Sequence, residues 1–121
     1  MAASSLRVLL VDDSEAIRFT MGAVLEMMGH EVQLAESLAE ARKVQTDGVY
    51  DVAILDVHLD DGLGTELIPE LRQLQPRAVI VMLSGLTTPD EVQGADLVLE
   101  KGQDAEGIVR RLEQAAAGRQ S

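Results

Sequence analysis

Acidic side chains stand at the ends of apolar segments of this 121-residue chain, where their charges are costly unless a ligand binds them. The candidates are five carboxylates and one lysine: Asp12, Asp13, Asp56, Asp60, Asp61 and Lys101. If the apolar segments are parallel strands of one sheet, their carboxyl ends share one edge and these side chains converge there. A divalent cation or a phosphoryl group would relieve the repulsion among them. The residue types therefore predict a site for a divalent cation or a phosphoryl group.

Apolar runs alternate with segments of helical periodicity along the whole chain. We expect strands over 6–11, 31–36, 51–55, 78–83 and 96–99, the second of them nearer an edge because its residues alternate between polar and apolar. Helices are expected between them, including one over 65–75, with Leu74 on its inner side, and a last one over 105–117. This order is typical of an α/β domain with a parallel sheet and right-handed crossovers.

The segment between the fourth and fifth expected strands is too short for a full covering helix. Thr88 and Glu91 form a capping box, Pro89 suits the first helical position and Gly94 can end the helix. These signals leave roughly one to two turns, against about 11 residues for an average helix. We expect the helix after the fourth strand to be shortened or absent.

Composition narrows the classes of partner. The chain has 10 basic and 21 acidic residues, a net charge of −11, so nucleic acid and anionic membranes are not expected to bind. It contains no cysteine, which excludes disulfides and thiolate metal sites. No apolar run reaches the ~18 residues of a membrane span, and the first five residues lack the features of a signal peptide. We expect a cytoplasmic protein.

Several segments together resemble the receiver domain of two-component response regulators, of the chemotaxis-regulator type. They are VLLVDDSEAIR, LEMMGHEV, YDVAILDVHLDDGLGTELIPELR, IVMLSG and GADLVLEKG, in this order. The resemblance covers nearly all of the chain and implies a single receiver domain over 1–121, with a doubly wound flavodoxin-like sheet of strand order 2-1-3-4-5. The implied chemistry is magnesium-dependent transfer of a phosphoryl group from the phosphohistidine of a sensor histidine kinase, or of a phosphotransfer protein, to an aspartate. A receiver is a phosphoacceptor in signalling and not an enzyme that turns over a substrate.

The resemblance also assigns roles to individual residues. Asp56 matches the phosphoacceptor. The Mg²⁺ ligands would be Asp13, Asp56 and the backbone carbonyl of His58, with Asp12 acting largely through water. Lys101 would pair with Asp56 and later with a phosphoryl oxygen.

Ser84 would donate its hydroxyl to another phosphoryl oxygen. That contact would couple the loop after the fourth strand, and the surface of the fifth strand, to phosphorylation.

Three departures from the family pattern affect the output surface. Val98 occupies the position of the usual aromatic switch residue, and valine cannot perform that rotamer change. Gly102 replaces the proline that usually follows the lysine, so we expect a trans peptide bond there. The segment from Ser84 to Lys101 is shorter than usual. We therefore predict that signalling depends on ordering of the loop over 85–94.

Other interpretations stay open at this point. Asp12 and Asp13 could simply cap the first helix. The chain could be a pseudo-receiver, a protein-interaction module that no longer takes phosphate, or a metal-dependent hydrolase with Asp56 as its nucleophile. The sequence does not name the kinase or the downstream partner, and the chain is either a stand-alone regulator or part of a longer protein.

Overall fold

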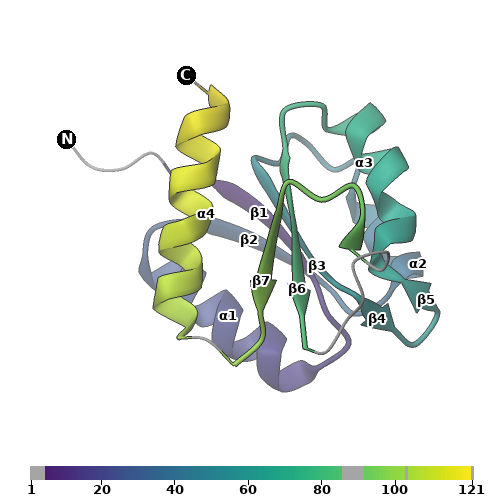
Figure 1. The fold of residues 1–121 in the computed structure, drawn as a ribbon, viewed down its shortest axis with the longest axis horizontal. Helices are drawn as coiled ribbons and strands as arrows, with labels where there is room; N and C mark the ends of the chain where they lie inside the picture. Colours follow the sequence, from purple (N-terminus) through teal and green to yellow (C-terminus); the bar gives the residue numbers. More distant parts are fainter. Residues whose placement is uncertain (1–4, 86–91, 103, 121) are drawn as a thin grey trace.

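Five parallel strands form one sheet in the computed structural model, which describes residues 5–85, 92–102 and 104–120. The strands are β1 (Arg7–Val11), β2 (Glu31–Ala35), β3 (Val52–Asp56), β6 (Val79–Ser84) and β7 (Leu97–Glu100). Their order across the sheet is β2-β1-β3-β6-β7 (Figure 1). Counting only the strands of this sheet, the order is the predicted 2-1-3-4-5, so the doubly wound α/β fold is confirmed.

Helices cover both faces of the sheet (Figure 1). On one face α1 (Glu15–Met27) and α4 (Ala105–Gln120) pack over an apolar core that includes Leu10, Ile54 and Leu112. On the other face α2 (Leu38–Val44) and α3 (Ile68–Leu74) cover a second core. Every residue of β3 and β6 is buried because these interior strands are enclosed on both sides. The edge strand β2 is largely half-exposed, as its alternating sequence predicts.

Serine side chains begin the first two helices. The Ser14 hydroxyl accepts a hydrogen bond from the Ile17 amide at the start of α1, and the Ser37 hydroxyl accepts one from the Glu40 amide at the start of α2. The N-cap of α1 is therefore Ser14, so the interpretation of Asp12 and Asp13 as its caps is wrong.

A small antiparallel hairpin follows β3, in a segment where the sequence predicted no strand. Its strands are β4 (His58–Leu59) and β5 (Gly62–Leu63), and the chain then enters a 3₁₀ turn, η1 (Gly64–Leu67). The helix predicted over 65–75 consequently begins as α3 only at Ile68. Leu74 is 45% exposed and not on the inner side, because α3 ends there with just seven residues.

No α-helix occurs in the described residues between β6 and β7, which are Gly85 and 92–96. The predicted capping residues Thr88, Pro89 and Glu91 lie outside the described part of the chain.

Val98 is 43% exposed on the edge strand β7. Across the described ranges, no helix is both long and apolar enough to cross a membrane.

A glycine holds the hairpin against the end of β3. The Gly64 amide donates a hydrogen bond to the Val57 carbonyl, and a Cβ at Gly64 would collide with the backbone carbonyl oxygen of Asp56. We predict that Gly64→Ala lowers the free energy of unfolding by about 1–3 kcal/mol, because the backbone must shift. Urea denaturation measures this change.

Gly22→Ala in the middle of α1 is the matched control. Its added Cβ would meet only the Leu34 side chain at 3.6 Å and the Val32 side chain at 3.9 Å. We expect this variant to be stabilised by up to ~1 kcal/mol through helix propensity. Equal stability of the Gly64→Ala variant and the parent chain would contradict the packing argument.

Candidate functional site

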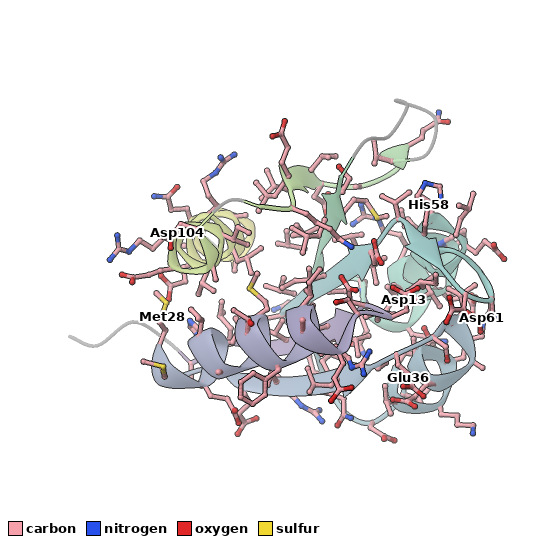
Figure 2. The ribbon with its side chains drawn as sticks, turned by 90° about the horizontal axis from the view of Figure 1, so that it is seen from below. Asp13, Met28, Glu36, His58, Asp61 and Asp104 are labelled. Atoms are coloured by element: carbon pink, nitrogen blue, oxygen red, sulfur yellow. The ribbon has the colours of Figure 1, made fainter. Side chains whose placement is uncertain are left out.

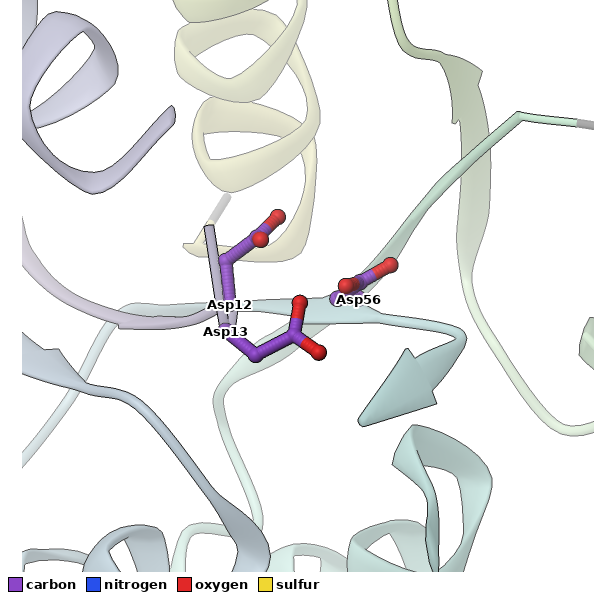
Figure 3. Close-up of side chains that lie close together, drawn as sticks. All are labelled: Asp12, Asp13 and Asp56. Carbon is purple, nitrogen blue, oxygen red and sulfur yellow. The ribbon is translucent and has the colours of Figure 1, made fainter. Parts of the chain in front are cut away.

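Three carboxylates meet at the carboxyl edge of the sheet. Asp12 and Asp13 follow β1, Asp56 ends β3, and one carboxylate oxygen from each lies within 4.8 Å of the others (Figure 3). Asp12 is completely buried and Asp56 is 5% exposed, whereas Asp13 faces solvent. The predicted convergence is therefore confirmed for these three residues.

Lys101 reaches this cluster from the end of β7. Its Nζ lies 2.8 Å from Asp56 Oδ1 and 3.3 Å from Asp12 Oδ2. The backbone holds it in place, because the Lys101 amide donates a 2.7 Å hydrogen bond to the carbonyl of Ser84, the buried last residue of β6. The Lys101–Gly102 bond is trans, as predicted, and Gly102 has φ +91°, a value that proline cannot adopt.

Burial dominates the electrostatics of Asp56. It raises the pKa of Asp56 from 3.8 to about 6, although the hydrogen bond from Lys101 acts in the opposite direction. The nearby charges of Asp12 and Asp13 add to the increase. For Lys101, burial lowers the pKa, but the hydrogen bond to Asp56 and the charge of Asp12 outweigh it and raise the value overall. Ionisation of Asp56 therefore costs free energy in the folded chain, and the Lys101 ammonium group offsets that cost only in part.

Asp12 uses its two carboxylate oxygens differently. Oδ1 accepts a 2.8 Å hydrogen bond from the Ser14 amide. Oδ2 is buried and accepts no hydrogen bond from the described residues, and only the Lys101 ion pair at 3.3 Å addresses it. A buried anionic oxygen in this position is available to a cation.

Asp60 and Asp61 do not join the cluster, so the prediction that five carboxylates converge is wrong for these two. The Asp61 carboxylate instead accepts hydrogen bonds from the Leu38 and Ala39 amides at the start of α2, at 2.9 and 3.1 Å. Those amides lower the pKa of Asp61. Asp60 is exposed at the tip of the hairpin. Asp61 thus ties the hairpin that follows Asp56 to α2.

The remaining predicted residues lie beside the cluster. His58 is in β4, two residues after Asp56, with an exposed side chain (Figure 2). Ser84 ends β6, the strand next to β3. Both lie near the carboxyl edge of the sheet, and their contacts with a ligand stay predictions.

The donor set suits a hard divalent cation. Carboxylate oxygens are the ligands that Mg²⁺ and Ca²⁺ prefer. In addition, the buried Oδ2 of Asp12 accepts no hydrogen bond from the described residues, so this oxygen can serve as a ligand. Asp12, Asp13 and Asp56 are the described acidic side chains that could hold such an ion together.

Comparison with known proteins identifies the family. The family model described as response regulator receiver domain matches residues 8–113. The chain belongs to this family, whose members act in two-component systems.

Individual relatives agree with this assignment. The chain is 36% identical to a gliding motility regulatory protein of Myxococcus xanthus over 84% of its own length and 14% of the relative's. It spans from 14% to 62% of the length of the first three curated relatives that it matches.

Two similar solved structures contain a metal ion. One, a response regulator from Burkholderia pseudomallei with a phosphorylated aspartic acid, a calcium ion and citrate, is 30% identical with a TM-score of 0.83 and covers 96% of this chain and 71% of the other. The second is the response regulator TrrA of Thermotoga maritima in complex with Mg²⁺ and BeF, 28% identical with a TM-score of 0.80 over 90% and 97% of the two chains.

The raised pKa of Asp56 predicts how stability changes with pH. Folding favours the protonated carboxyl, so the stability that Asp56 contributes is fully present below about pH 3.8 and is lost as the pH rises through about 6. An Asp56→Asn variant has no such loss. In EDTA we expect its Tm to exceed that of the parent by an increasing margin from about pH 4 to about pH 7.

Differential scanning fluorimetry across this pH range measures the margin. Asp60→Asn removes an exposed carboxylate outside the cluster and serves as the control for the loss of one charge. A margin for Asp56→Asn that stays constant, or that shrinks as the pH rises, would contradict the burial argument.

Proposed function

We propose that the chain is a phosphoacceptor receiver that takes a phosphoryl group onto Asp56. The observation that carries the proposal is the buried Asp56 carboxylate, held 2.8 Å from Lys101 and within 4.8 Å of two further carboxylates. The donor would be the phosphohistidine of a sensor histidine kinase or of a phosphotransfer protein. Family membership and the phosphorylated aspartic acid of the Burkholderia pseudomallei relative support this proposal.

In the proposed reaction a carboxylate oxygen of Asp56 attacks phosphorus in line with the donor imidazole. The new O–P bond forms as the P–N bond breaks, and the imidazole nitrogen keeps the electron pair and takes up a proton. The product is an acyl phosphate on Asp56. Lys101, already paired with Asp56, follows the developing charge onto a phosphoryl oxygen, and the Ser84 hydroxyl donates to another.

Asp12, Asp13, Asp56 and the His58 carbonyl would hold Mg²⁺. When bound, the ion neutralises carboxylate charge that would otherwise repel the incoming phosphoryl group. The Mg²⁺ in complex with the Thermotoga maritima relative supports this choice of ion. At low pH, a proton competes with the ion for the Asp56 carboxylate, whose pKa is about 6.

The output of the switch is proposed to differ from that of relatives with an aromatic residue at the position of Val98. Ser84 begins the connection between β6 and β7, so a phosphoryl group held by its hydroxyl would act on this connection and on β7. Ordering of the loop over 85–94 remains a prediction, since 86–91 lie outside the described residues.

A small phosphodonor tests the proposal directly. Acetyl phosphate with Mg²⁺ is expected to add one phosphoryl group to the parent chain, and intact-mass spectrometry measures the product. Asp56→Asn should take up none, because the nucleophile is lost. Lys101→Met should fold and react far more slowly, by roughly 10²–10³-fold, as expected when one charge-stabilising donor is removed.

The same experiment separates the other two interpretations. A parent chain that stays unmodified at saturating donor and Mg²⁺ would support the pseudo-receiver and contradict the proposal. Release of many equivalents of phosphate from a phosphate ester would support the hydrolase. Addition of EDTA is expected to stop the reaction of the parent chain.

A further inference from the structure

We propose that Arg18 is a positioning residue for the turn that carries Asp12 and Asp13. Its Nη1 donates a 2.7 Å hydrogen bond to the main-chain carbonyl oxygen of Asp12. Its Nη2 lies 3.7 Å from Glu36 Oε2, beyond the end of β2. This assignment rests on the proposed binding of Mg²⁺ by the same turn.

Three hydrogen bonds hold Asp12: one at its amide, one at its carbonyl oxygen from Arg18, and one at a carboxylate oxygen. The Asp12 amide donates to the carbonyl of Ala35, the last residue of β2, at 3.0 Å. Oδ1 of Asp12 accepts from the Ser14 amide. With the carbonyl held by Arg18, the carboxylate has little freedom to turn its remaining oxygen, Oδ2, away from the cluster.

Arg18 is built into the fold and is not a mobile surface cation. Its side chain is 17% exposed, and it extends from the second turn of α1 back toward the helix N-terminus, the direction that helical side chains favour. Its ion-pair partner, Glu36, directly follows Ala35. Arg18 therefore connects the turn after β1 with the end of β2. In the view of Figure 2, Glu36 and His58 lie on opposite sides of Asp13.

The Arg18 guanidinium donates a hydrogen bond to a backbone carbonyl and does not pair with the carboxylates of the cluster. Among the described residues, no ion pair joins Arg18 to Asp12, Asp13 or Asp56. As a charge, Arg18 disfavours a cation nearby, so its removal would strengthen Mg²⁺ binding if charge were its only influence. As a positioning residue, its removal weakens Mg²⁺ binding. The two roles therefore have opposite signs.

Calorimetric titration of the folded chain with Mg²⁺ distinguishes these roles. We expect Arg18→Met to weaken Mg²⁺ binding by roughly tenfold, the usual scale for loss of a residue that orients a ligand. Arg18→Lys keeps the charge but replaces the planar fork with a single ammonium, so it should also bind more weakly than the parent.

Arg42→Met is the matched control. Arg42 on α2 makes a comparable ion pair with Glu70 on α3, at 3.0 Å. The Arg42→Met variant should bind Mg²⁺ as the parent does. A second measurement needs no metal: amide exchange in EDTA should be faster at Ser14 in Arg18→Met than in the parent, with no change at Gly64.

Binding by Arg18→Met that is equal to or tighter than that of the parent would overturn the assignment, as would unchanged exchange at Ser14. If the parent chain itself takes up no Mg²⁺, the proposed metal site is wrong and the role of Arg18 is overturned with it. The parent titration thus separates failure of the proposed function from failure of this inference alone.

Discussion

The ion pair between Asp56 and Lys101 is the interaction on which the site depends, and it compensates the Asp56 charge only in part. Asp56 is buried beside two other carboxylates, and one ammonium group at 2.8 Å does not restore its ordinary pKa. A buried anion with partial compensation favours the arrival of further positive charge. The same imbalance that weakens the resting fold at this point thus makes the edge of the sheet receptive to a cation.

The surrounding fold holds the charged groups of the site in a fixed geometry. Parallel strands bring Asp12, Asp56 and Ser84 to one edge, and the Ser84 carbonyl fixes the backbone of Lys101. Asp61 ties the hairpin after Asp56 to α2 and takes no part in the cluster. Side chains that look equivalent in the sequence therefore divide into those that create the charge and those that constrain the backbone around it.

Most of the sheet and the cluster could be predicted because both follow from strand periodicity. Asp12, Asp56 and Lys101 stand at strand ends, and the parallel topology then dictates where they meet. Two-residue strands such as β4 and β5 have no periodic signal, so the hairpin was missed. The contacts of Asp61 and Arg18 with distant backbone groups were missed for a different reason: nothing local in the sequence indicates which amide or carbonyl such a side chain will reach.

The charge state of the Asp56 carboxyl group decides whether this edge of the sheet attracts a cation, and ¹³C NMR of the Asp56 side chain reports that charge state directly. A pH titration of labelled chain in EDTA should give Asp56 a pKa of about 6, and saturating Mg²⁺ should lower that value substantially. A pKa near 3.8 in EDTA, unchanged by Mg²⁺, would contradict the account. Ionised Asp56 would then be as stable as an ordinary carboxylate, and its burial would give no reason for a cation to bind.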